Sequence, residues 1–136
     1  MSVCTLRINE RDVAVPTGTT LLEAARQASI PIPTLCFLEG LSAVAACRLC
    51  LVELEGSDKL QAACVTAVAE GMQVRTDSPR LREIRRSVIE LLFTEGNHVC
   101  AICVANGHCE LQDLARHLGI DHVDFSYLYP ILSVDA

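Results

Sequence analysis

Apolar and polar positions alternate at the start of the chain. Between residues 3 and 8 every second residue is apolar, with Cys4 and Leu6 on the same face, which predicts a strand with one buried side. The polar run 9–12 predicts a turn, and residues 12–15 predict the returning strand of a hairpin. Cys4 is therefore expected to be a small apolar core residue of this hairpin.

The spacing of apolar residues changes to a helical period after the hairpin. Thr20 and Glu23 have the spacing of a capping box, and the apolar positions after Thr20 predict a helix to about Ser29. Pro31 and Pro33 then end this helix and keep the chain extended. Further short strands are predicted at residues 51–54, 60–62 and 72–76, which together with the hairpin and helix favour a β-grasp domain over residues 1–77.

A second helical pattern follows at Ser78-Pro79, an N-cap followed by proline in the first turn. Its apolar positions run to Leu92, and Gly96 marks its expected end. Four arginines lie mostly between the apolar positions, at 80, 82, 85 and 86. They are predicted to form a solvated helix face, with docking of an acidic partner as the alternative.

The predicted architecture is α+β, because strands dominate the first part and helices the second. A further helix is expected from Cys109, with an apolar stripe of Leu111, Leu114 and Leu118 that ends at Gly119. The predicted domains are residues 1–77, a small helical domain at 78–124, and a linker-like tail at 125–136.

Composition narrows the classes of function. Of the 136 residues, 51% are hydrophobic and none is tryptophan. The net charge of the chain is −6, and this negative charge argues against nucleic acid as a partner. No apolar run has the length of about 20 residues that a membrane span needs, and the start of the chain has no signal-peptide pattern. Eight cysteines would form disulfides in a secreted protein and metal sites in the cytosol. We therefore expect a cytoplasmic metalloprotein.

The first cysteine group has a spacing typical of a metal site: Cys36-x10-Cys47-x2-Cys50-x13-Cys64. The tight Cys47–Cys50 pair can point two thiolates at one centre, and the fold must bring in the outer two. Small residues before Cys47 and Cys64 let backbone N–H groups approach inorganic sulfide. Four thiolates are the usual ligands of a [2Fe–2S] cluster. A zinc ribbon and plain core cysteines are the alternatives.

The second group is His98-x-Cys100-x2-Cys103-x5-Cys109, among several glycine and asparagine residues that favour a loop. N–H groups at the predicted helix start would stabilise the Cys109 thiolate. Three cysteines and one histidine suit zinc and a four-iron cluster equally well. The other histidines, at 108, 117 and 122, are expected to be surface residues.

The two groups together resemble a known family. The residues that carry the resemblance are 31–36 (PIPTLC), 46–50 (ACRLC), 63–66 (ACVT), 95–107 (EGNHVCAICVANG) and 109–112 (CELQ). In this order, separated by one amphipathic helix, they resemble the N-terminal part of the large iron–sulfur subunit of respiratory complex I. More specifically, they resemble the small iron–sulfur subunit of the diaphorase module of NAD(P)-linked bidirectional nickel–iron hydrogenases.

The resemblance implies the fold, the cofactors and the partners. It implies a β-grasp [2Fe–2S] ferredoxin domain followed by a small helical His/Cys3 [4Fe–4S] domain. The two-iron ligands would be Cys36, Cys47, Cys50 and Cys64, and the four-iron ligands His98, Cys100, Cys103 and Cys109. The partners would be a flavoprotein that binds FMN and NAD(H) and the hydrogenase small subunit, with electrons relayed between them and no substrate site on this chain.

One departure from the family is large. Its members continue into a domain with two further four-cysteine motifs, which residues 1–136 do not contain. The chain is therefore expected to be a truncated form, a natural short form or a degraded copy. The runner-up function is a zinc-stabilised interaction module without a redox role, and a third is an independent soluble ferredoxin.

Overall fold

The structure is a computed structural model that describes residues 2–96 and 98–126. It divides into two compact units, Met1–Arg82 and Glu83–Ala136, and each is described by itself below. Of the expected tail, residues 127–136 lie outside the described residues. In the part of the chain that the structure describes, every helix is too short or too polar to cross a membrane.

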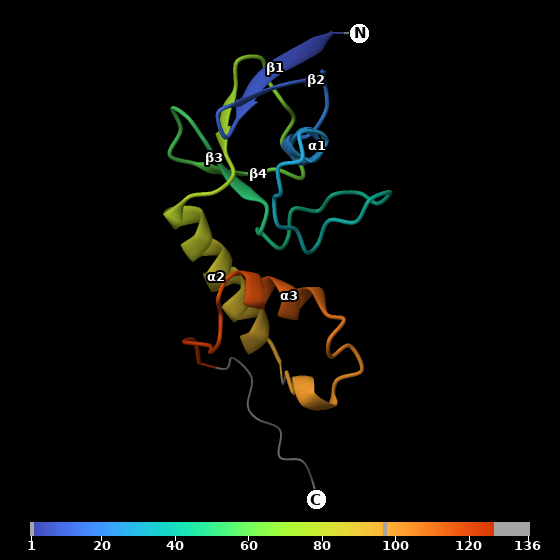
Figure 1. Ribbon diagram of the computed structural model, residues 1–136, viewed down its shortest axis with the longest axis vertical. Coiled ribbons are helices and arrows are strands. Elements are labelled where there is room, and N and C mark those ends of the chain that lie inside the picture. Colours follow the sequence, from blue (N-terminus) through green and yellow to red (C-terminus); the bar gives the residue numbers. More distant parts are fainter. Residues whose placement is uncertain (1, 97, 127–136) are drawn as a thin grey trace, which may run out of the picture. The chain divides into compact units, whose positions relative to one another are not determined.

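The first unit is built on a five-stranded mixed sheet with strand order β2-β1-β5-β3-β4 (Figure 1). Strands β1 (Val3–Ile8) and β2 (Arg11–Pro16) form the predicted antiparallel hairpin. Strand β5 (Gln73–Arg75) pairs parallel with β1 and antiparallel with β3 (Leu51–Leu54), and β3 also pairs with β4 (Leu60–Ala62). The predicted strands are confirmed, although β5 is shorter than expected.

Helix α1 (Leu21–Gln27) covers one face of this sheet, because Leu21, Leu22, Ala24 and Ala25 are all buried. The capping box of Thr20 and Glu23 is present as predicted. The helix ends at Gln27 with Ala28 as its C-cap, and the next residue, Ser29, has a left-handed φ of 57°. The Ile30 N–H donates to the Ala25 carbonyl at 2.8 Å, so the exit direction of the chain is fixed by a Schellman-type cap.

Helix α2 (Pro79–Thr94) begins as predicted, since the Ser78 hydroxyl accepts from the Leu81 N–H. The prediction that the arginines of this helix are exposed to solvent is confirmed for Arg80 and Arg82. It is wrong for Arg85, which is only 4% exposed. A long side chain can lie buried along its stem, so helical spacing alone did not reveal this position. Arg86 donates to the carbonyls of Leu118 and Gly119.

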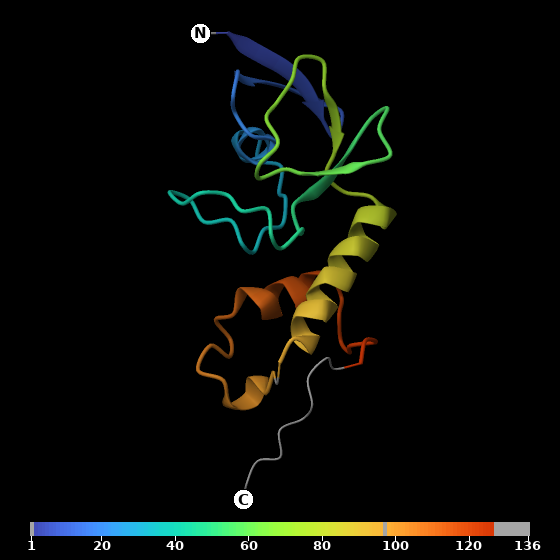
Figure 2. The ribbon, with the colours of Figure 1, turned by 180° about the vertical axis from the view of Figure 1, so that it is seen from behind.

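The rest of the second unit comprises a 3-10 turn, η1 (Cys100–Ile102), and helix α3 (Glu110–His117). Helix α3 starts after Cys109 as predicted, but Ala115 is its buried residue and the leucine stripe is half-buried. The contacts of Arg86 place a positive charge at the C-terminal end of α3, where the helix dipole favours it. Figure 2 shows the long loop between η1 and α3.

Candidate metal centres

Cys50 and Cys64 are brought together by the pairing of β3 with β4. Cys50 precedes β3, and Cys64 follows β4 by two residues. Because these strands are antiparallel, the start of one lies beside the end of the other. The Ala63 N–H donates to the Cys50 carbonyl at 3.1 Å, which continues the ladder up to the two cysteines. Both side chains are buried.

Cys36 and Cys47 form a second contact pair. The Cys47 N–H lies 3.4 Å from the Cys36 sulfur, to which it donates a weak hydrogen bond. The backbone that makes this possible has left-handed φ values at two non-glycine residues, 52° at Ala45 and 60° at Arg48. Such conformations persist only where the surrounding structure imposes them, and they turn successive N–H groups toward one concave side.

The environment of the thiols differs between the pairs. Burial raises the pKa of Cys64 to about 11, and the hydrogen bond and charge of Cys50 and the charge of Cys36 act in the same direction. For Cys47, burial also acts to raise the pKa, but hydrogen bonds with the backbone of Leu49 and Cys36 lower it below its ordinary value. Metal binding at this site would therefore release protons, above all from Cys64.

The four cysteines of the first group lie in two pairs. The Cys47 N–H donates to the Cys36 sulfur, and the Ala63 N–H, next to Cys64, donates to the Cys50 carbonyl. A [2Fe–2S] core takes two thiolates on each iron, so two adjacent pairs match its needs.

The second group is built on local chain geometry. The Cys103 N–H donates to the Cys100 carbonyl at 3.2 Å across η1, which places these two cysteines on one turn. Cys109 is the N-cap residue of α3. The loop between is held by Gln112, which accepts from the Gly107 N–H and donates to Asn106. Cys103 is exposed, and Cys100 and Cys109 are half-buried.

His98 lies four residues beyond Thr94, the last residue of α2. Its Nε2 is 3.1 Å from the Leu92 carbonyl, and its ring packs edge-on against Phe93 with centroids 5.3 Å apart. A ligating histidine commonly donates one ring N–H to a carbonyl and binds metal with the other nitrogen. The donor set of one imidazole and three thiols fits an iron–sulfur centre, while His108, His117 and His122 are exposed as predicted.

Two features near the first group were missed from the sequence. The guanidinium of Arg26 lies over the ring of Phe37, 4.8 Å from its centroid, directly beside Cys36. The left-handed φ of Ala45 and Arg48 could not be predicted from the sequence either, because neither residue is a glycine or asparagine, the types that usually adopt this conformation. A cation eleven positions before an aromatic residue, across two prolines, has no recognised spacing.

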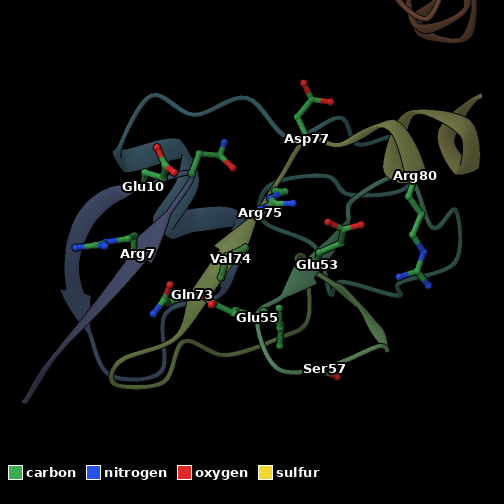
Figure 3. A pocket seen from close by; sticks show the side chains of 12 residues that line it. Arg7, Glu10, Glu53, Glu55, Ser57, Gln73, Val74, Arg75, Asp77 and Arg80 are labelled. Atoms are coloured by element: carbon green, nitrogen blue, oxygen red, sulfur yellow. The ribbon is translucent and has the colours of Figure 1, made fainter.

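A cavity of about 850 Å³ lies elsewhere in the first unit, on strands β1, β3 and β5 (Figure 3). Its lining carries both charge signs, for example Arg75 on β5 and its register partner Glu53 on β3 (Figure 3). It contains no cysteine or histidine. Its lining therefore offers no thiolate or imidazole ligand for an iron–sulfur cluster.

Comparisons with known proteins support both centres. Residues 2–79 match the family of 2Fe-2S iron-sulfur cluster binding domains, and residues 85–124 match the NADH-ubiquinone oxidoreductase-G iron-sulfur binding region. The chain is 44% identical to the NADP-reducing hydrogenase subunit HndD of Solidesulfovibrio fructosivorans over 125 residues, which cover 88% of this chain and 21% of HndD. It is 33% identical over 130 residues to the gamma subunit of the NAD-reducing hydrogenase HoxS of Cupriavidus necator. These residues cover 96% of this chain and 55% of that subunit.

A solved structure agrees in fold. A chain in the crystal structure of NAD+-reducing [NiFe]-hydrogenase in the H2-reduced state superposes with a TM-score of 0.87 at 38% identity, covering 94% of this chain and 54% of that chain. The chain thus spans about a fifth to about half of the length of these relatives. The predicted resemblance, the α+β fold and both kinds of cluster-binding region are confirmed. The chain belongs to the family of 2Fe-2S iron-sulfur cluster binding domains, and this domain is followed by an NADH-ubiquinone oxidoreductase-G iron-sulfur binding region.

Proposed function

We propose that this chain relays single electrons within an NAD(P)-linked oxidoreductase, as part of the diaphorase module of a bidirectional hydrogenase. The observation that carries the proposal is the pairing of Cys36 with Cys47 and of Cys50 with Cys64 in a two-iron binding domain. We assign a β-grasp domain to residues 1–77, a helical His/Cys3 domain to residues 78–124, and a linker-like tail to residues 125–136.

The proposed ligands divide between the two domains. A [2Fe–2S] cluster would be held by Cys36, Cys47, Cys50 and Cys64, and a [4Fe–4S] cluster by His98, Cys100, Cys103 and Cys109. When bound, such clusters accept and release one electron at a time. The chain's own contribution is to fix the thiolates, exclude water around Cys50 and Cys64, and direct backbone N–H groups toward sulfur. No residue is assigned as a general acid, base or nucleophile.

The partner that we propose on the input side is a flavoprotein that binds FMN and NAD(H). NADH gives up a hydride, which carries two electrons, and flavin is the usual converter to single electrons. The seven glycines lie at 18, 40, 56, 71, 96, 107 and 119, so the Gly-x-Gly of a dinucleotide fingerprint is missing. On the output side we propose the hydrogenase small subunit.

We assign the protein to the cytoplasm. The sequence contains eight cysteines, and seven of them fall in the two groups with metal-site spacing. Thiols persist in reducing compartments, where metal binding competes with no disulfide.

The test mixes the iron-loaded chain with NADH under anaerobic conditions and follows the visible absorbance of the clusters. Reduction is expected only after the flavoprotein subunit is added. Bleaching at a catalytic rate without flavoprotein would contradict the proposal, as would the absence of bleaching with it. The spectrum before NADH separates the alternative function, because a zinc-stabilised interaction module is colourless.

A further inference from the structure

Helix α1 contacts the chain on both sides of the first cysteine group. In its first turn, the Leu21 N–H donates to the Thr66 carbonyl at 2.9 Å and the Leu22 N–H donates to the Ala63 carbonyl at 3.0 Å. Ala63 and Thr66 flank Cys64. The N-terminal end of the helix is thus tied directly to the segment that carries one outer cysteine.

The last turn of α1 contacts the segment that carries the other outer cysteine. The Arg26 guanidinium lies over the Phe37 ring at 4.8 Å, and Phe37 follows Cys36 in the chain. The ring is half-buried and packs against the hydrophobic core. The Ser29 cap fixes the helix end, since the Ser29 N–H donates to the Arg26 carbonyl at 3.0 Å. Arg26 is therefore presented from a rigid position.

The loop that Phe37 anchors has little other regular support. Residues 37–46, all of them described, form no helix or strand. Leu38, Leu41 and Val44 are each more than 60% exposed. The loop projects on the α1 side of the unit, away from the β3–β4 turn, in both Figure 1 and Figure 2. Its placement depends on its ends and on the few side chains that reach the core.

We propose that Arg26 and Phe37 form a positioning pair that holds Cys36 at a fixed separation from Cys64, with α1 as the spacer between them. This inference rests on the proposed binding of a [2Fe–2S] cluster by these cysteines. The guanidinium covers the outer face of the ring, so Phe37 stays against the core and Cys36 stays in register with Cys47. Neither side chain binds the cluster itself.

The experiment measures two quantities on the iron-loaded full chain: the rate at which a chelator removes the two-iron absorbance, and the shape of the reduced two-iron EPR signal. A cation–π contact at an exposed site contributes about two- to fivefold in an equilibrium. Arg26→Gln and Phe37→Leu are each expected to accelerate cluster loss by about this factor. The double variant should be no worse than the worse single variant, because the two act through one contact.

The controls separate positioning from general damage. Phe37→Tyr keeps the ring and should behave as wild type, with an unchanged EPR line shape. Arg75→Gln removes the same charge from β5, on the sheet face opposite the buried Val74, and should change neither quantity. The expected signature is an altered EPR line shape in Arg26→Gln and Phe37→Leu, together with the wild-type line shape in Phe37→Tyr.

Two results would overturn the inference. One is cluster loss in Arg26→Gln and Phe37→Leu at the rate of Arg75→Gln, and the other is full additivity of the two substitutions. These outcomes leave electron transfer from the flavoprotein intact, so they are distinct from a failure of the proposed function. A wild-type chain that takes up iron and sulfide without two-iron absorbance would overturn both.

Discussion

The two cysteine groups are supported in different ways. In the first, Cys50 and Cys64 lie beside the paired strands β3 and β4 and are buried in the core. In the second, Cys103 is exposed. Its neighbour Ile102 is 82% exposed, and its other neighbour Val104 is fully exposed. Strand pairing and side-chain burial fix Cys50 and Cys64 of the first group. Turns and hydrogen bonds of Gln112 hold the loop of the second group.

This difference implies different states without metal. A site whose ligands sit on a packed sheet keeps its geometry because the core stabilises it independently. A site formed by a loop with few buried side chains opens at low free-energy cost. Metal binding then supplies much of the ordering energy of the loop. We expect the Cys50–Cys64 half of the first centre to be preformed and the second centre to be ordered by its cluster.

The largest expected effect is all-or-none. Cys50→Ser and Cys47→Ser should each abolish the EPR signal of the reduced two-iron cluster, because both residues lie in the tight pair of the first group. Cys4→Ser is the matched control, since Cys4 is buried in the hairpin with its sulfur 3.4 Å from the Thr17 hydroxyl. It should leave the signal intact. Survival of the signal in both Cys47→Ser and Cys50→Ser would show that the ligand assignment is wrong.

Removal of iron should loosen the loop of the second cysteine group and leave the sheet of the first unit unchanged. Without its cluster, the segment 99–108 is expected to be cleaved by elastase at least about tenfold faster than in the loaded chain, since local opening then costs at least about 1.4 kcal/mol less. Amides of β1 and β3 should keep their hydrogen-exchange protection. Mass spectrometry reports both. Equal cleavage rates with and without iron would contradict the comparison.

His98→Cys sharpens the assignment of the second group. Replacing a neutral imidazole by a thiolate adds negative charge at the four-iron cluster, which disfavours the reduced form. If the variant assembles, its midpoint potential should fall by at least about 60 mV, a tenfold change for one electron. His117→Ala, on an exposed position of α3, should leave it unchanged. A potential that stays the same or rises would exclude His98 as a ligand.

The smallest expected effect is a pH dependence in the second unit. A hydrogen bond from His122 to Asp121 raises the pKa of His122, with the charges of Asp124 and Asp121 adding to it. The charged imidazole therefore stabilises the fold fully below the ordinary value of 6.5, and this contribution is lost as pH rises through the raised pKa. NMR titration of the imidazole should show a lower pKa in Asp121→Asn. An unchanged value would refute the pairing.

The sequence predicted most elements of the fold because their signals are local. The alternation in residues 3–8, the capping box at Thr20 and the Ser78-Pro79 start are each decided within a few residues. Arg85 was predicted wrongly, because burial on a helix depends on what covers it. The same limit applied to α3, where Ala115 rather than the leucine stripe is the buried position.

For the metal centres, the cysteine spacing by itself identified the candidate ligands and left iron–sulfur and zinc open. The tertiary structure decided how the ligands group, because only the β3–β4 register places Cys50 beside Cys64. It also revealed the contact of Arg26 with Phe37 and the left-handed backbone at Ala45 and Arg48. Spacing records which residue types are available, whereas distances between ligands depend on strand register and helix packing, which form between distant parts of the chain.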